Sequence, residues 1–176
     1  MSTKNLEVYE INNKEVLDKL AKFDITYERA EAFHYLALEV KGAYRQIPDK
    51  ITQLMQLTAT QNLFPAMRGA VFAIFYNDPR EVAGEDEYYW AVGYPCAENA
   101  DFKAPLKLKE RNESFVAKAT IYGPYDKLAE VYPLIEEQIT KDGYKILFWS
   151  LEMYLDDPRT VKPENLRTQA WIDVKK

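Results

Sequence analysis

Apolar residues gather in six short stretches of the chain, which fall into two successive sets of three. The stretches are 32–40, 70–76 and 87–94 in the first set, and 114–122, 146–155 and 166–174 in the second. All are rich in β-branched and aromatic residues, and Asn-Asp-Pro at 77–79 and Asp-Asp-Pro at 156–158 follow the two middle stretches. Because proline cannot continue a strand ladder and Asn and Asp favour turns, each stretch is predicted to be a strand.

Between the first and second stretch of each set, apolar residues recur at helical spacing. In the first set they are Ile47, Ile51, Leu54 and Met55, and in the second Leu128, Val131, Tyr132, Ile135 and Ile139. Pro48 is tolerated in a first helical turn, and Gly143 is placed to end the second helix. Each set is therefore predicted to be a β-α-β-β unit.

Short landmarks match between the two sets. The segment GAYRQIP at 42–48 resembles GPYDKLA at 123–129, and AIFYNDP at 73–79 resembles EMYLDDP at 152–158, at nearly equal separations. A duplicated unit explains both matches. We expect an α+β fold in which two βαββ repeats are arranged about a pseudo-two-fold axis. Its antiparallel sheet would carry the two main helices on one face, with a central cleft between the repeats.

The same landmarks predict the domain organisation. Residues 1–30 are an N-terminal extension, in which Asn13 to Lys22 favours a short helix. Residues 31–176 are the folded domain, with repeat 1 at 31–95, a crossover at 96–112 and repeat 2 at 113–175.

Composition and charge exclude several classes of function. The 176-residue chain has a net charge of −5, which argues against direct nucleic-acid binding, and the lysines at 103–109 are interpreted as solvated linker charges. One cysteine (Cys96) and one histidine (His34) are too few for a disulfide or a Cys/His zinc site, so no cofactor or metal is expected. No export signal or membrane-spanning run is present, and the expected location is the cytoplasm.

Glu152 is the most unusual position, because it is a lone carboxylate inside the apolar segment KILFWSLEMYLDDP at 145–158. Burying an unpaired carboxylate is costly, and the matching position of the first repeat is Ala73, so a role in a site is favoured. Strict alternation would turn Glu152 and Tyr154 towards the cleft and pack Leu151 and Met153 under the helices. The candidate ligand-binding residues are Glu152, Tyr154, Trp171, Trp90, Tyr125 and Tyr44; if the protein is an enzyme, Glu152 is the candidate catalytic residue.

Three segments resemble a known family: GPYDKLAEVY at 123–132, LEMYLDDP at 151–158 and LRTQAWIDV at 166–174. They are similar to the GyrI-like small-molecule-binding domain, which is the effector-binding domain of multidrug-responsive transcription regulators and also occurs alone in DNA gyrase inhibitory proteins. The resemblance covers about residues 24–174. It implies a central pocket with Glu152 at its floor, ringed by aromatic residues, that takes cationic lipophilic ligands.

This sequence departs from the family pattern at two positions, because Asp173 stands near a usual proline and Ala43 replaces the proline of Gly-Pro-Tyr. Residues 1–30 contain no helix-turn-helix. We therefore expect a stand-alone domain that binds small molecules, cationic lipophilic ones in particular, without a membrane or nucleic-acid partner. Two alternatives stay open: hydrolysis of reactive cyclopropane-bearing compounds by Glu152 and a tyrosine, and a gyrase-inhibitor-like module that binds an unidentified protein.

Overall fold

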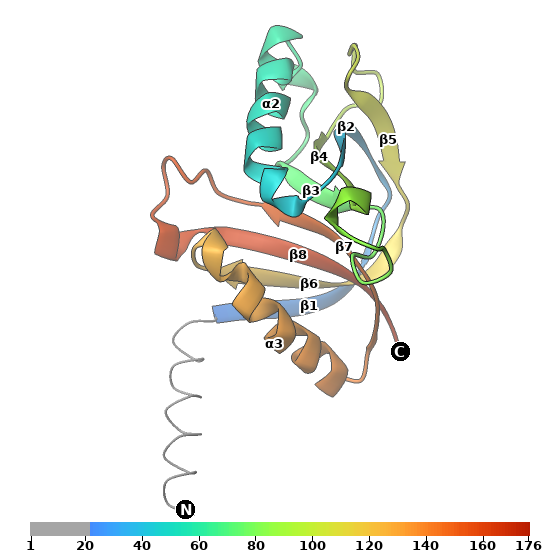
Figure 1. The fold of residues 1–176 in the computed structure, drawn as a ribbon, viewed down its shortest axis with the longest axis vertical. Coiled ribbons are helices and arrows are strands. Elements are labelled where there is room, and N and C mark those ends of the chain that lie inside the picture. Colours follow the sequence, from blue (N-terminus) through green and yellow to red (C-terminus); the bar gives the residue numbers. More distant parts are fainter. Residues whose placement is uncertain (1–21) are drawn as a thin grey trace, which may run out of the picture.

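A computed structural model describes residues 22–176 as one eight-stranded antiparallel sheet with two α-helices on one of its faces (Figure 1). The helix expected in the N-terminal extension lies outside the described residues, apart from Lys22. In chain order the elements are β1 (Lys22–Ala30), β2 (Phe33–Lys41), α2 (Ile47–Thr60), β3 (Phe72–Phe75), β4 (Tyr89–Pro95), β5 (Lys107–Arg111), β6 (Ser114–Tyr122), α3 (Leu128–Lys141), β7 (Lys145–Tyr154) and β8 (Arg167–Lys175). The predicted fold class is confirmed.

The order of strands across the sheet is β1-β6-β8-β7-β3-β4-β2-β5, and it reads symmetrically from its centre. One half contains β2-α2-β3-β4 and the other β6-α3-β7-β8, so the same element order occurs twice. The halves meet where β3 pairs with β7, through Phe72↔Met153, Ala73↔Glu152 and Ile74↔Leu151. Glu152 therefore lies at the seam between the halves.

Two edge strands were not predicted. β1 pairs along nine residues with β6, and β5 pairs with β2, so each half receives its outermost strand from the segment that precedes the other half. Lys107 and Lys109, interpreted above as linker charges, lie on β5 and form ion pairs with Glu39 of β2. That interpretation was wrong because a strand that pairs on one side only needs few apolar residues.

The helices cover two separate apolar clusters on the same face of the sheet. Under α2 the cluster includes Leu54, Trp90 and Tyr94, and under α3 it includes Ile135 and Ile139. Both helices are amphipathic, and their apolar stripes supply these contacts. No helix among residues 22–176 is long and apolar enough to cross a membrane.

A third apolar cluster lies on the opposite face of the sheet, where neither helix packs. It contains Tyr35, Phe72, Leu151 and Trp171, with Met153 packed against it. Leu151 and Met153 were expected under the helices, and the structure corrects this. Large aromatic side chains cover this face instead, as in the edge-to-face contact of Tyr35 with Phe72 at a ring separation of 5.5 Å.

Glu39 joins three strands at the border of this aromatic cluster. It accepts hydrogen bonds from Lys107, from Lys109 at 2.6 Å and from the Tyr89 hydroxyl at 2.7 Å. Burial alone would raise the pKa of Glu39, but these three donors outweigh it and lower the pKa to about 2. Glu39 thus stabilises the attachment of β5 in its ionised form.

We expect Glu39→Gln to lower the free energy of unfolding by about 1–3 kcal/mol near neutral pH. Because the folded-state pKa of about 2 lies below the ordinary value of 4.5, the stabilisation is present above pH 4.5 and is lost as the pH falls towards 2. Denaturant titrations at neutral and acidic pH would measure this. Glu137→Gln removes an exposed carboxylate paired with Lys141 and is the matched control. An equal stability gap at both pH values for Glu39→Gln would contradict the assignment.

Candidate functional site

Glu152 projects from β7 into the layer between the sheet and α3. Its ladder neighbours are Ala73 on β3 and Ala170 on β8, so small side chains flank it on both sides. The residue keeps partial exposure, although its carboxylate is surrounded densely enough to be desolvated. Two alanines beside one glutamate leave room over the strand for groups from the helix above.

Two tyrosines hold the Glu152 carboxylate. The hydroxyl of Tyr132, on α3, donates to Glu152 Oε2 at 2.6 Å, and the Tyr154 hydroxyl donates to Oε1 at 3.3 Å. Burial raises the pKa of Glu152, and these two hydrogen bonds oppose that shift without cancelling it. Within residues 22–176 no lysine, arginine or histidine forms an ion pair with Glu152. The site therefore contains a desolvated acid without a counter-charge.

Aromatic rings extend from the carboxylate in two directions. Tyr154 meets Tyr125 edge-to-face at a ring separation of 5.6 Å. Tyr132 meets Trp149 at 4.8 Å in a tilted arrangement. Burial also raises the pKa of the Tyr132 and Tyr154 hydroxyls, and the Glu152 charge adds to it. Both tyrosines are therefore neutral hydrogen-bond donors at physiological pH.

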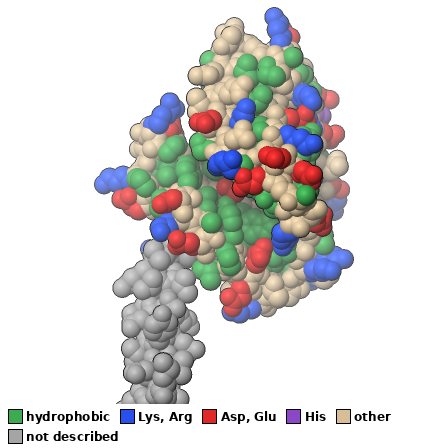
Figure 2. Space-filling model, viewed as in Figure 1, with side chains coloured by type: hydrophobic (Ala, Val, Ile, Leu, Met, Phe, Trp, Pro, Cys, Tyr) green, Lys and Arg blue, Asp and Glu red, His purple; other side chains and the backbone are tan. Residues whose placement is uncertain are grey.

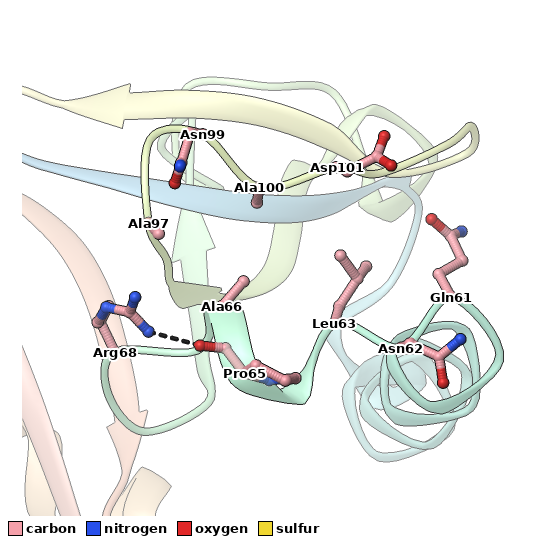
Figure 3. Close-up of a pocket in the computed structure, with 10 residues that line it drawn as sticks. All are labelled: Gln61, Asn62, Leu63, Pro65, Ala66, Arg68, Ala97, Asn99, Ala100 and Asp101. Atoms are coloured by element: carbon pink, nitrogen blue, oxygen red, sulfur yellow. Dashed lines mark hydrogen bonds between the residues drawn. The ribbon is translucent and has the colours of Figure 1, made fainter.

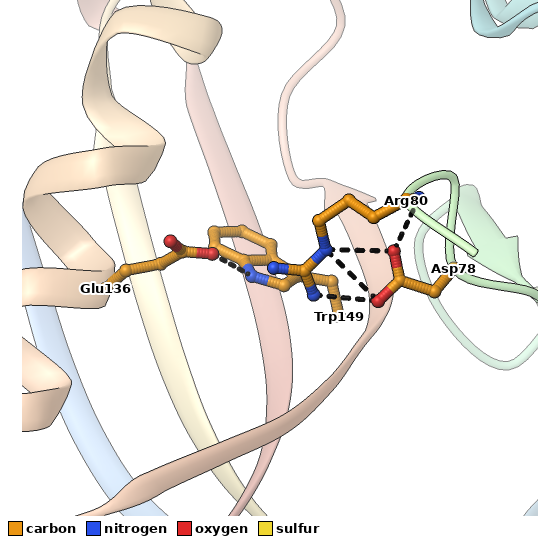
Figure 4. Close-up of polar contacts among 4 residues, drawn as sticks. All are labelled: Asp78, Arg80, Glu136 and Trp149. Carbon is orange, nitrogen blue, oxygen red and sulfur yellow. Dashed lines mark hydrogen bonds and ion pairs between the residues drawn. The ribbon is translucent and has the colours of Figure 1, made fainter.

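An arginine from the first half of the chain reaches this aromatic row (Figure 4). Asp78 binds Arg80 through paired hydrogen bonds, and the guanidinium points towards Trp149 and Glu136 of the second half. Trp149 Nε1 in turn donates to Glu136 at 2.8 Å. The pKa of Arg80 is raised mainly by its hydrogen bond with Asp78, and the Glu136 charge contributes. Arg80 thus places a positive charge of the first half near Glu136 of the second.

The predicted site residues separate into three places. Tyr125 and Tyr154 lie beside Glu152. Tyr44 and Trp90 pack together in the core under α2, where Trp90 is fully buried. Trp171 is on the far face of the sheet, because its neighbour Ala170 is the residue that pairs with Glu152.

Two residues near the carboxylate were missed, Tyr132 and Trp149. Tyr132 was assigned only to the apolar stripe of its helix. Trp149 lies an odd number of residues from Glu152 and should face away, but an irregularity in the β7 ladder at Ser150 brings both to one face. No signal in the sequence marks that irregularity.

Open pockets occur elsewhere on the described surface. One, of about 500 Å³, lies between the end of α2 and the segment after β4 and is lined by Gln61, Arg68 and Asp101 among others (Figure 3). Its Gln61 amide already bonds both backbone groups of Lys103, and Arg68 bonds the carbonyl of Pro65, so these groups serve the local fold. A second, of about 430 Å³, borders Glu39 and Tyr89. Neither is lined by Glu152.

The helix-bearing face is hollowed between the regions of α2 and α3, and hydrophobic side chains gather there with charged ones around them (Figure 2). This hollow lies over the centre of the sheet, where the halves meet (Figure 1). Among residues 22–176 no group of three or more His, Cys, Asp and Glu side chains is placed to hold a metal ion. The arrangement is suited to a non-covalent ligand with apolar surface.

Several solved structures share this fold. The EcmrR C-terminal domain has a TM-score of 0.71 at 12% identity, covering 88% of this chain and 98% of its own. EcmrR in its complex with DNA has a TM-score of 0.70 at 13% identity, covering 98% of this chain. This chain spans only 64% of that longer one. SAV2435 bound to tetraphenylphosphonium has a TM-score of 0.59 at 13% identity, covering 86% of this chain and 94% of that one.

A hydrolase from Listeria innocua is similar as well, with a TM-score of 0.59 at 12% identity and coverage of 93% and 97%. These identities establish a common fold alone. No curated protein sequence matches the chain. The family model described as the GyrI-like small molecule binding domain matches residues 23–175. The match spans nearly the whole described chain, which therefore belongs to the GyrI-like small-molecule-binding domain family.

Proposed function

We propose that this chain binds lipophilic cations, with Glu152 as the counter-charge at the centre of the site. The observation that carries the proposal is a desolvated carboxylate that is bonded only by tyrosine hydroxyls and has no cationic partner within residues 22–176. A buried acid in this state is costly to the fold, and a cationic ligand removes that cost by pairing with it.

The aromatic row supports the same ligand class. Tyr125, Tyr154, Tyr132 and Trp149 offer ring faces and edges within reach of the acid. Each cation–π contact contributes about 0.5–2 kcal/mol when desolvated, so several rings together add substantially to one charge pair. SAV2435, which shares this fold, has been solved with tetraphenylphosphonium, a lipophilic cation. That ligand is therefore the first probe for this chain.

The Glu152 carboxylate can exchange its tyrosine hydrogen bonds for a bound cation. In this structure they satisfy the Glu152 oxygens, and an arriving cation would take over that role as the carboxylate ionises. A cation that pairs with Glu152 would displace at least one tyrosine hydroxyl from the carboxylate. Tyr154 makes the longer of the two hydrogen bonds, at 3.3 Å, and is the side chain expected to yield.

We expect Glu152→Gln to weaken tetraphenylphosphonium binding by at least about tenfold, which corresponds to about 1.4 kcal/mol. The amide keeps the shape, and it can accept from one tyrosine hydroxyl and donate to the other, but it cannot neutralise the cation. Isothermal titration calorimetry on both proteins would measure the change. Glu137→Gln, on the exposed side of α3, alters net charge equally and should bind as the wild type does. Equal weakening in both variants would reduce the effect to overall charge and contradict the proposal.

The affinity for tetraphenylphosphonium should also fall as the pH is lowered through the pKa of Glu152. This pKa lies above the ordinary 4.5, because burial favours the protonated form, and only the ionised form attracts the cation. The probe keeps its charge at every pH, so the titration reports on the protein. A pH-independent affinity in the wild type, matching that of Glu152→Gln, would exclude Glu152 as the counter-charge.

The contribution of Glu152 to the free energy of unfolding should depend on pH in the opposite direction to the ligand affinity. A carboxyl group whose pKa is raised on folding favours the fold at low pH, and this contribution is lost as the pH rises through the raised value. Glu152→Gln should therefore raise the free energy of unfolding by about 0.5–2 kcal/mol at neutral pH. Thermal unfolding at neutral and acidic pH measures it, and a destabilised variant at neutral pH would show that the carboxylate is structurally required.

Hydrolysis is a second candidate, favoured by one observation. Glu152 has a raised pKa and lies 2.6 Å from the Tyr132 hydroxyl, a pair that could protonate a leaving group or activate water. Incubation with a cyclopropane-bearing alkylating compound, followed by chromatography, should then give a ring-opened product with the wild type and none with Glu152→Gln. Product formation at the uncatalysed rate with both proteins would leave binding as the function.

A further inference from the structure

The two halves of the sheet can be aligned residue by residue through their ladders. In the first half, Trp90 pairs with Val40 on one side and Phe75 on the other. In the second half, Thr168 pairs with Ile121 and Tyr154. The turns agree as well, because Gly42 and Gly123 have the same φ of +137°. The Gly42 N–H donates to the carbonyl of Tyr88, two residues before Trp90, at 2.9 Å. The Gly123 N–H donates to the carbonyl of Leu166, two residues before Thr168, also at 2.9 Å. Thr168 therefore occupies the place of Trp90.

The first half fills this place with a closed aromatic box. The Trp90 indole is fully buried, and its Nε1 donates to the Gly42 carbonyl at 2.7 Å. Tyr44 packs edge-to-face against both Trp90, at 6.1 Å, and Phe75, at 5.1 Å. Every polar group of the indole is thus used, and the box belongs to the core.

The second half keeps the walls of the box but lacks its indole. Tyr125 and Tyr154 stand where Tyr44 and Phe75 stand in the first half, and they meet edge-to-face in the same way, at 5.6 Å. Within residues 22–176 no side chain donates a hydrogen bond to the Gly123 carbonyl, whereas Trp90 donates one to the Gly42 carbonyl.

The Thr168 side chain is a second, independent sign that the two halves differ at this place. This side chain is fully buried, and its hydroxyl oxygen has no hydrogen-bond partner among the described residues. Buried hydroxyls are nearly always bonded, and a valine would avoid the cost. Thr58, by contrast, is equally buried but bonds the Leu54 carbonyl and the Tyr94 hydroxyl. The Thr168 hydroxyl therefore lacks, among the described residues, the kind of partner that the equally buried Thr58 has.

We propose that Gly123, Tyr125, Tyr154 and Thr168 form an aromatic subsite in which a planar ring of the ligand takes the place that Trp90 fills in the first half. A ring N–H of the ligand donates to the Gly123 carbonyl. Because the Tyr154 hydroxyl reaches Glu152, a cationic group attached to that ring by a short chain lies next to the carboxylate. The inference rests on the proposed function and narrows its ligand class to arylalkylamines with a ring N–H donor.

Entry into the subsite has a structural route. Thr168 is enclosed, whereas Tyr125 is partly exposed on the short 3-10 turn that precedes α3. Movement of the Tyr125 ring would open the space beside Gly123. The ring of the ligand then replaces one aromatic contact with another, so the apolar surroundings of the box are kept.

The first test compares two probes on the wild-type chain by isothermal titration calorimetry. Tryptamine carries an indole N–H and an ammonium group, and 1-methyltryptamine has a methyl group in place of the N–H hydrogen. We expect the methylated probe to bind about three- to tenfold more weakly, as for one lost hydrogen bond. Glu152→Gln should weaken both probes. Equal affinities of the two probes, or no tryptamine binding by a chain that binds tetraphenylphosphonium, would overturn the subsite and leave the proposed function intact.

The second test fills the subsite with the residue that the first half uses. Thr168→Trp should keep the far-ultraviolet circular dichroism of the wild type and lose tryptamine affinity by at least about tenfold. Unchanged tryptamine affinity in a folded Thr168→Trp variant would overturn the inference. If Glu152→Gln changes the affinity for none of tryptamine, 1-methyltryptamine and tetraphenylphosphonium, the proposed function fails together with the subsite.

A third measurement does not depend on a ligand, and it applies even if Thr168→Trp fails to fold. Thr168→Val should raise the midpoint of thermal unfolding by about 2–4 °C, because it removes an unbonded buried hydroxyl. Thr58→Val is the matched control and should lower the midpoint, since it removes a bonded one. A lower midpoint for Thr168→Val would mean that the hydroxyl already has a partner, and the position would then be explained by folding alone.

Discussion

The pairing of β3 with β7 is the constraint on which the rest of the molecule depends. Three residue pairs join two four-stranded halves into one sheet, and Ala73↔Glu152 is the central pair. The pairs on either side of it, Phe72↔Met153 and Ile74↔Leu151, have large side chains on both strands, so a small residue stands opposite the acid alone. The position of the acid is therefore set by the connection between the halves, at the point where two helices diverge and the face is hollow. A ligand bound here would contact both halves.

Much of the fold was predictable, because the strongly apolar strands and the amphipathic helices carry periodic patterns that do not depend on distant contacts. All six expected strands and both helices are present, with ends displaced by a few residues. β1 and β5 escaped prediction for different reasons. β5 is a charged edge strand, and pairing with the distant β2 stabilises it. β1 does alternate, with Phe23, Ile25 and Tyr27 packed against the cluster under α3, and this period-two pattern was missed.

The site was predictable only in part. Glu152 was conspicuous because a charge inside an apolar strand contradicts the local pattern, and such conflicts concentrate at functional positions. Tyr132 and Trp149 could not be found in the same way. Tyr132 satisfies the helical pattern completely, and the position of Trp149 depends on a ladder irregularity that leaves no mark in composition. Trp90 and Trp171 were chosen for their residue type, and type alone does not say which face or which half of the sheet a side chain occupies.

The exchange of β1 and β5 between the halves also has a consequence for how the chain folds during synthesis. β1 leaves the ribosome first, yet its partner β6 is made only after the whole first half, including α2, β3 and β4. Until then β1 is an unpaired strand with a free edge. β1 must therefore find β6 across the whole first half, and pairing between segments so far apart in the sequence is intrinsically slow. The first half faces the same delay on a smaller scale, because β2 is completed by β5, the last strand made before β6. The four strands of the first half are therefore all made before β6, whereas the second half is completed only by recruiting β1 from the far side of the first.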